Sequence, residues 1–327
     1  MARFLAGRLI QAIAIVFVVA SLTFILFRLA PGDPFSTMSD FSSASEEFKD
    51  QARRNLGLDQ PIHTQYLKYL ANLVRGDLGM SFSEHRPVLE SIGARIPATI
   101  VLAAAALLVD FLLGIFVGAH QGAHTGSKGD DALSVLTLTL YSVPVFWLGM
   151  MFVLLFASNV GLLGILPATG AKTTAMYEHL TPYGQMWDRI RHLILPALTL
   201  GLAGAAGTAR YQRAAMLEVI RQDFVRTARA KGLRERTVLF RHALRNALLP
   251  VITLFGLSFP ILLSGAVLVE VVFNWPGLGR LVVDSALARD YNVVTGAAIV
   301  AAIMVVIGNT IADILYRIVD PRVRLES

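Results

Sequence analysis

Long apolar segments alternate with polar ones along the chain, and the apolar segments are long enough to cross a membrane. A bilayer core about 30 Å thick needs roughly 20 helical residues, because unpaired backbone groups cannot face lipid. Six segments meet this need: residues 9–29, 98–119, 132–156, 193–209, 247–268 and 293–315. The pattern predicts an all-α polytopic membrane protein with six transmembrane helices.

The first apolar segment follows Arg3 and Arg8, an arrangement that also occurs in secretory signals. Its length and the lack of a cleavage site with small residues favour a helix that is retained. Composition agrees with a membrane protein, because only 16% of the residues are charged, whereas a soluble domain carries roughly 25%. The chain has no cysteine, which excludes disulfides, thiolate metal sites and cysteine nucleophiles.

Basic residues predict which side of the membrane each loop occupies, because Lys and Arg are retained in the cytoplasm. The connection at 210–245 holds ten Lys or Arg against three acidic residues, and both chain ends are basic. With six spans, this connection and both termini fall on one side, which we expect to be cytoplasmic. Residues 31–97 then lie outside, where short helices are expected at 45–56 and 60–75, closed by Gly57 and Gly76. A tight turn is expected at 275–279 of the third outer loop.

Prolines and glycines mark special positions in the expected spans. Pro144, Pro196, Pro250 and Pro260 can act as hinges or can reflect the higher frequency of proline in membrane helices. The small residues Gly201, Gly204 and Gly207 indicate close packing of the fourth span against another helix, in this chain or in a partner.

Ionisable residues inside the spans are scarce. Asp110 lies midway along the second span and Asp313 near the end of the sixth. A carboxylate within the membrane is a candidate proton relay or cation site. Asp110 has no second titratable group near it in sequence, which favours a structural hydrogen bond to a neighbouring helix. The scarcity also argues against a proton-coupled secondary transporter.

The segment 223–232 carries the most specific local signal. Asp223 is expected to cap a short helix, Phe224, Ala228 and Lys231 to share one side of it, and Gly232 to end it. A second helix is expected at 235–249. A short rigid helix with an apolar anchor ringed by charge suits docking in a cleft. Binding to anionic lipid is an alternative, and a nucleic-acid reader is disfavoured by the six spans.

The sequences RTARAKG at 226–232 and HALRNALLP at 242–250 resemble the coupling loop of ABC importer permeases, and more narrowly the dipeptide, oligopeptide and nickel branch. Further motifs similar to that branch are PGDP at 31–34, GDLG at 76–79, PAT at 97–99, LPA at 195–197, FNWPGLGR at 273–280, RDY at 289–291 and DPRVR at 320–324. The Glu-Ala-Ala of the wider importer family is replaced by Arg226-Thr227-Ala228. A docking contact that needs that glutamate is therefore not carried over.

The resemblance implies a type I ABC importer transmembrane fold with both termini in the cytoplasm. It implies a second homologous permease, two cytoplasmic ABC ATPases that hold ATP and Mg, an extracytoplasmic substrate-binding protein and membrane lipid as partners. The chain itself is expected to bind no cofactor, metal or nucleic acid and to have no catalytic residue. Its expected location is the cytoplasmic (inner) membrane of a bacterium or archaeon.

The resemblance also implies a division of the chain. We expect an N-terminal transmembrane helix at 1–30, an extracytoplasmic region at 31–94, a transmembrane core at 95–316 with its coupling loop at 210–245, and a cytoplasmic tail at 317–327. The residues expected to couple to the ATPases are Asp223, Phe224, Val225, Arg226, Thr227, Ala228, Arg229, Ala230, Lys231 and Gly232. Ser258, Pro260 and Ser264 are candidates for the pathway or a hinge.

Motifs for covalent chemistry are absent from the sequence. It contains neither a phosphate-binding loop of the G-x-x-x-x-G-K-[ST] form nor an H-E-x-x-H zinc motif. The resemblance to the dipeptide, oligopeptide and nickel branch implies the function of a permease subunit that forms half of the pathway of an ATP-driven importer for di- or oligopeptides. The alternatives are import of nickel chelates or glutathione-like compounds by the same class, or a stand-alone channel or secondary transporter.

Overall fold

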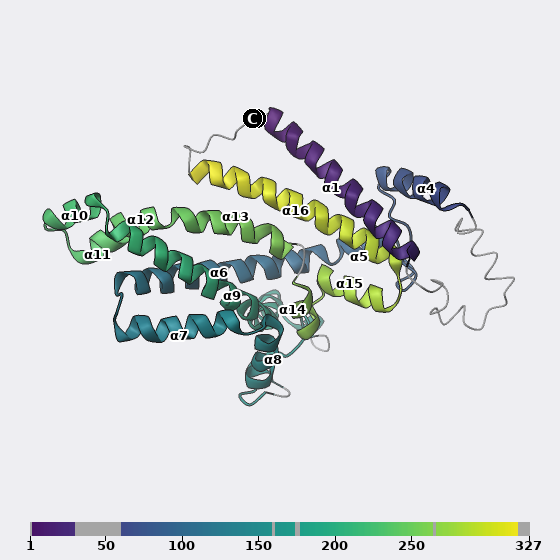
Figure 1. Cartoon of the computed structure of the whole chain (residues 1–327). Helices are drawn as coiled ribbons and strands as arrows, with labels where there is room; N and C mark the ends of the chain where they lie inside the picture. The colour runs from purple at the N-terminus through teal and green to yellow at the C-terminus, as the bar shows by residue number, and fades with distance from the viewer. Residues whose placement is uncertain (1, 30–59, 159–160, 174–176, 264–265, 320–327) are drawn as a thin grey trace.

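The computed structural model describes residues 2–29, 60–158, 161–173, 177–263 and 266–319, and the regular elements in these ranges are helices (Figure 1). They are α1 (Ala2–Leu29), α4 (Ile62–Val74), α5 (Val88–Gly93), α6 (Ile96–Ala123), α7 (Lys128–Ser142), α8 (Val145–Phe156), η2 (Tyr177–His179), α9 (Pro182–Ile220), α10 (Asp223–Ala230), α11 (Glu235–Thr237), η3 (Val238–Ala243), α12 (Leu244–Ala247), α13 (Leu249–Leu263), α14 (Val267–Val272), α15 (Leu278–Leu287) and α16 (Tyr291–Val319). The expected all-α class is confirmed. The expected helix at 45–56 and the motifs at 31–34 and 320–324 lie outside the described residues.

Four stretches are long and apolar enough to cross a membrane: Ala6–Leu26, Val88–Ala123, Pro182–Ile220 and Tyr291–Ile314. Two bent helix pairs bring the number to as many as six if each pair is one span. Figure 1 shows α10, α11 and α12 at one end of the bundle, here named the coupling end, and α4, α5 and α15 near the opposite end.

The third expected span is not a straight helix. It is divided into α7 and α8, and the chain bends by 107° between them. Val143 adopts an extended conformation with φ −78° and ψ 131°, and Pro144 precedes the first residue of α8. Proline removes a backbone donor and disfavours helical geometry at the residue before it, which accounts for the elbow at this point.

The region around the fifth span also differs from expectation. The expected single helix at 235–249 consists of α11, the π-helix η3 and α12, followed by a 46° bend into α13. The span expected to end at residue 268 is shorter: α13 ends at Leu263, and Ala266, with φ −86° and ψ 65°, precedes the separate helix α14.

Two long helices, α6 and α9, form the centre of the bundle and run parallel. Along the half nearer the coupling end, the glycines of α6 face larger side chains of α9, because β-carbons built on Gly114 and Gly118 would lie 2.6 and 2.7 Å from the β-carbons of Thr208 and Gln212. Such close approach of helix backbones needs glycine. The register continues one turn further, at Gly122 and Met216.

In the other half of the pair the glycines belong to α9. A β-carbon on Gly201 would lie 2.5 Å from that of Val109, and one on Gly204 would lie 2.7 Å from the carboxyl carbon of Asp110. The close packing expected for the fourth span is therefore confirmed for these two glycines. A β-carbon built on Gly207 would instead lie 3.8 Å from the ring of Tyr141 in α7.

Buried carboxylates tie segments distant in sequence together at the end opposite the coupling end. Asp290 accepts hydrogen bonds from the hydroxyls of Ser81 and Ser83, at 2.7 and 2.9 Å. Glu270 accepts bonds from the backbone N–H of Arg280 at 2.9 Å and from the hydroxyl of Thr99 at 3.2 Å. The turn expected at 275–279 is confirmed, since it links α14 to α15 around the Glu270 carboxylate.

The N-terminal helix α1 packs against α16. Arg8 forms an ion pair with Asp313, so the second carboxylate expected within a span has a cationic partner. The rest of α1 is largely exposed, and only 6% of its apolar stretch is buried inside the chain.

Candidate coupling site

The short helix α10 begins differently from the prediction. Gln222 occupies the N-cap position, and no side chain caps the helix there. Asp223 is the first residue of the helix, where its carboxylate is 98% exposed and lies 3.8 Å from Arg226. The prediction of Asp223 as a cap is wrong, although a carboxylate in the first turn still interacts favourably with the positive end of the helix dipole.

The face that α10 buries also differs from the prediction. Val225 is fully buried and Ala228 is 5% exposed, a spacing of three residues that places both on one helical face. Phe224 is 39% exposed, and Lys231 is exposed as well. The expected group of Phe224, Ala228 and Lys231 is therefore divided, with Ala228 inside and the other two available to a partner.

The end of α10 is as predicted. Gly232 has φ +76°, in the left-handed region that favours glycine. Its N–H bonds the carbonyl of Arg229 at 2.9 Å, and the N–H of Leu233 bonds that of Ala228 at 3.4 Å. These two bonds form a Schellman motif, which satisfies the last carbonyls of the helix and reverses the chain direction.

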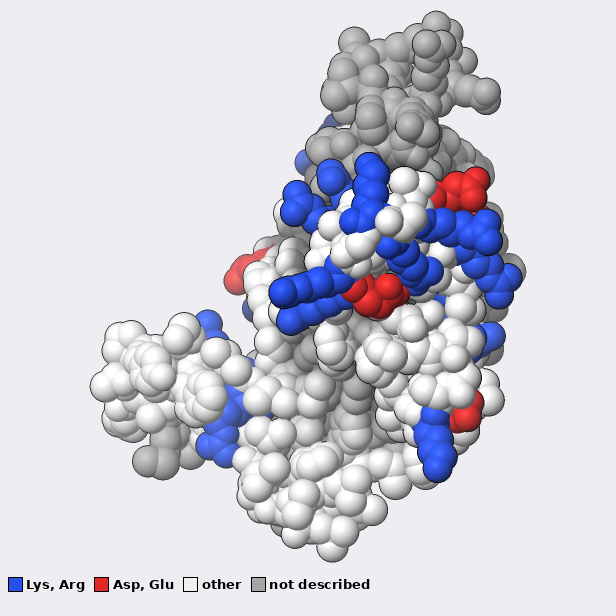
Figure 2. Space-filling model, turned by 90° about the vertical axis from the view of Figure 1, so that its left-hand side faces the viewer, with Lys and Arg blue, Asp and Glu red and all other residues white. Residues whose placement is uncertain are grey.

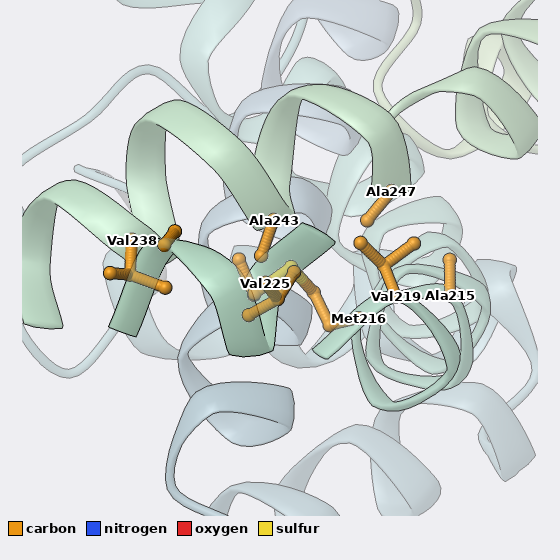
Figure 3. Packing of buried hydrophobic residues seen from close by; sticks show 9 residues of the cluster. Ala215, Met216, Val219, Val225, Val238, Ala243 and Ala247 are labelled. Atoms are coloured by element: carbon orange, nitrogen blue, oxygen red, sulfur yellow. The ribbon is translucent and has the colours of Figure 1, made fainter. Parts of the chain in front are cut away.

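A cluster of small and medium apolar side chains attaches α10 to the bundle (Figure 3). Its members come from α6, α9, α10, η3 and α12: Ala119, Ala215, Met216, Val219, Val225, Ala228, Val238, Ala243 and Ala247. In Figure 3, Val225 lies among Met216 of α9 and Ala243 of η3. The cluster thus packs α10 against the ends of α6 and α9.

An ion pair closes the turn after α10. Arg229 donates to Glu235 through Nη2 at 2.7 Å and Nε at 3.2 Å. Both side chains are about half exposed, so the pair sets geometry and contributes little to stability.

The coupling end is strongly basic. Figure 2 views the molecule from this end and shows Lys and Arg gathered over it, with few acidic residues between them. The exposed cations of the loop at 210–245 are Arg210, Arg221, Arg226, Arg229, Lys231, Arg234, Arg236, Arg241 and Arg245. A protruding apolar side chain, Phe224, lies within this basic surface.

A second connection joins the loop end of α9 to α7. Arg213 donates to both carboxylate oxygens of Asp130, at 2.8 and 3.0 Å. Asp130 also accepts a bond from the backbone N–H of Gly126, and its own N–H bonds the N-cap hydroxyl of Ser127. This pair was not predicted from the sequence, although Ser127 with Asp130 and Asp131 in the turn that follows signals a helix start at that point.

Among the candidate pathway residues, the structure describes the side chain of Ser258 alone. Ser258 is partly buried in α13, and Pro260 lies within the same helix. Ser264 is outside the described residues, as is the side chain of Pro260. The described residues contain no group of three or more His, Cys, Asp or Glu that could hold a metal ion.

Comparison with known proteins assigns the family. The model of the family described as binding-protein-dependent transport system inner membrane component matches residues 110–325, and the model of its N-terminal region matches residues 1–103. The chain is 42% identical over 324 residues to the oligopeptide transport system permease protein AppB of Bacillus subtilis, with 99% of each chain covered. It is 41% identical over 336 residues to the di/tripeptide transport system permease protein DppB of Pseudomonas aeruginosa, again with 99% of each chain covered.

More distant similarities agree on the fold. A structure of the MetNI methionine ABC transporter in inward-facing conformations aligns with a TM-score of 0.54 and 16% identity, covering 71% of this chain and 97% of that one. The glutathione transport system permease protein GsiC of Escherichia coli is 36% identical over 324 residues, with 99% of each chain covered. The chain belongs to the family of inner membrane components of binding-protein-dependent transport systems.

Proposed function

We propose that this chain is the permease subunit that forms half of the translocation pathway of an ATP-driven importer for di- or oligopeptides. The observation that carries the proposal is the similarity, over 99% of the chain, to relatives named as oligopeptide and di/tripeptide permeases. Glutathione permeases are also similar, at 36–37% identity, so glutathione-like cargo is the alternative within the same class. Nickel chelates are a further alternative.

ATP hydrolysis takes place in separate subunits in this proposal. The chain pairs with a second homologous permease and two cytoplasmic ABC ATPases that hold ATP and Mg, and an extracytoplasmic binding protein delivers the cargo. The chain itself holds no cofactor, metal or catalytic group. The family description, an inner membrane component of a binding-protein-dependent system, supports an assembly of this kind.

Segment 223–232 is the coupling lever of the proposed mechanism. Phe224 and the exposed cations of α10 contact the ATPase, while Val225 and Ala228 anchor the helix to the bundle. The tight packing between α6 and α9 makes these two helices move as one body. A displacement of α10 by the ATPase therefore tilts that pair and changes access to the pathway.

The proposed topology has six spans, with α7–α8 and α11–α13 each counted as one, and both termini in the cytoplasm. The coupling end faces the cytoplasm because the connection at 210–245 holds ten Lys or Arg against three acidic residues. In this topology residues 1–30 form the N-terminal transmembrane helix and residues 31–94 the extracytoplasmic region. Residues 95–316 form the transmembrane core, and residues 317–327 form the cytoplasmic tail. Ser258, Pro260 and Ser264 stay candidates for the pathway or a hinge in α13 and the residues after it.

The test is mass spectrometry of the proteins that co-purify with the tagged chain after extraction in mild detergent. Recovery of two ATPases, a second permease and a binding protein supports the proposal, and the ligand of that binding protein identifies the cargo. A chain that purifies alone and moves solute in vesicles without ATP contradicts it in favour of a channel or secondary transporter.

A further inference from the structure

The helix α4 lies against the apolar part of α1. The hydroxyl of Tyr66 in α4 is 2.6 Å from the hydroxyl of Ser21 in α1. The ring of Phe24 in α1 contacts the rings of Tyr66 and Tyr69, with centroids 5.3 and 5.4 Å away. These contacts determine the position of α4 along the axis of α1, whereas the sequence alone predicts that α4 lies in an aqueous outer loop.

This level is inside the stretch of α1 that is apolar enough to lie in a membrane. In the sequence that stretch continues to Phe27, just before Arg28, and Ser21 and Phe24 precede its end. At a rise of 1.5 Å per residue, the contacts with Tyr66 and Tyr69 lie about 5 to 9 Å inside the apolar stretch. An interfacial helix buries its apolar face to a similar depth, roughly 5–10 Å.

The surface of α4 fits such a place. None of its residues is buried, and Lys68 is the one charged residue among its 13. Ile62, Leu67 and Val74 are 64%, 63% and 89% exposed. Large apolar side chains with this exposure are unfavourable in water and favourable among acyl chains.

The exposed apolar surface of α4 continues that of α1. At the level of the contacts, Leu22, Ile25 and Leu26 of α1 are 55%, 50% and 62% exposed. A helix that is apolar enough to cross a membrane, and of which only 6% of the apolar stretch is buried inside the chain, presents such side chains to lipid. Lipid that contacts this side of α1 therefore also contacts the adjoining side of α4.

We propose that α4 is embedded in the membrane leaflet at the carboxyl end of α1, with Leu67 and Val74 in contact with acyl chains. Lys68 reaches the headgroups with its flexible stem. The helix then anchors the chain that follows it, where Leu78 packs against the buried cluster that includes Val88 and Val293. The inference rests on the proposed function in one respect: the proposed topology identifies this leaflet as the outer one.

The absence of cysteine from the chain allows a direct test. Leu67→Cys and the matched control Asn72→Cys, which is exposed on the polar face of the same helix, are introduced separately. Each variant is assembled with its partner subunits, labelled with the fluorophore NBD and reconstituted into vesicles. The assembly with the cysteine-free chain, treated in the same way, provides the background from the other subunits.

The expected result is that acyl-chain nitroxide lipids quench the probe at position 67 about twofold more than the probe at 72, while aqueous iodide quenches in the opposite order. Quenching of position 67 by iodide and not by nitroxide overturns the proposal. Protection of position 67 from both quenchers also overturns it, in favour of a protein contact. Val74→Cys provides an independent second site if Leu67→Cys does not assemble.

Discussion

Arg213 of α9 binds the carboxylate of Asp130 in α7 through two hydrogen bonds, at 2.8 and 3.0 Å. The two residues differ in environment, because the Asp130 side chain is 3% exposed and that of Arg213 is 33% exposed. The pair ties the turn between α6 and α7 to the part of α9 that leads into α10. It therefore belongs to the body that the proposed lever moves.

The unequal burial predicts unequal effects of substitution. Arg213→Met leaves a buried carboxylate without its partner, which costs on the order of 3–5 kcal/mol of stability. Asp130→Asn costs less, because the guanidinium of Arg213 can turn to water and the amide oxygen of asparagine can still accept a bond. Thermal unfolding of the purified assembly in detergent measures both effects. The double variant Asp130→Asn with Arg213→Met should be more stable than Arg213→Met alone, and an equal loss in the two single variants contradicts the argument.

The parallel packing of α6 and α9 predicts that Gly118 does not tolerate a side chain. In Gly118→Ala the new methyl group collides with the Ala209 carbonyl and with the β-carbon of Gln212, 2.7 Å away. Overpacking of this kind costs about 1–3 kcal/mol, so we expect a lower unfolding temperature and reduced transport. Gly7→Ala in α1 is the matched control, because a β-carbon there meets nothing within 4 Å. Equal unfolding temperatures for the two variants contradict the close approach of the helices.

Local patterns were sufficient to predict the helical class and the apolar stretches, because a bilayer requires about 20 apolar residues whatever the fold. The elbow between α7 and α8 was not predicted, even though Pro144 was noted. Proline shows that a backbone bond is lost, but the 107° angle depends on what the two halves pack against. The helix expected at 235–249 contains a π-helix for a similar reason, since its apolar residues do not specify the local winding.

The sequence correctly predicted the end of α10, which depends on one glycine, but it missed the side-chain pairs that join residues distant along the chain. Gly232 was correctly expected to end α10, because the left-handed conformation is a property of glycine itself. Asp130 and Arg213 are 83 residues apart, and Asp290 and Ser81 are 209 apart. No periodicity links such residues, so their pairing follows only from the packing of the helices that carry them.

The expectation that Asp110 has a structural role leads to a third prediction. Its carboxylate accepts a hydrogen bond of 2.7 Å from the hydroxyl of Thr208 and lies over Gly204. Asp110→Asn keeps an acceptor oxygen and nearly the same shape, so we expect most transport activity to remain. Asp110→Leu leaves the Thr208 hydroxyl without this partner and adds bulk against Gly204, so stability should fall by about 1–3 kcal/mol.

Uptake of labelled peptide by cells that produce each Asp110 variant tests this role, with the amount of assembled transporter measured in parallel. Loss of uptake in Asp110→Asn at a normal level of assembly contradicts a structural role and favours a titrating one. Thr208→Val is a second control, because it removes the donor and leaves the carboxylate in place.

The left-handed conformation of Gly232 predicts a graded set of variants at the end of α10. A β-carbon at this position meets nothing within 4 Å, so any effect comes from the backbone. Gly232→Val places a β-branched residue at φ +76°, which costs on the order of 1–3 kcal/mol. Gly232→Pro is more severe, since proline cannot adopt this φ and lacks the N–H that bonds Arg229. We expect both to leave membrane insertion intact and to reduce transport.

Gly232→Asn is the matched control, because asparagine tolerates the left-handed region better than other residues with a side chain. It should retain most of the ATP hydrolysis that the binding protein stimulates in the purified assembly, whereas Gly232→Val and Gly232→Pro should lose it. The loss should follow the strain at this residue rather than the size of the side chain, because the space around it is open. Full peptide uptake by Gly232→Pro would show that the end of α10 does not transmit the motion, and the lever would have to be sought elsewhere on the basic surface.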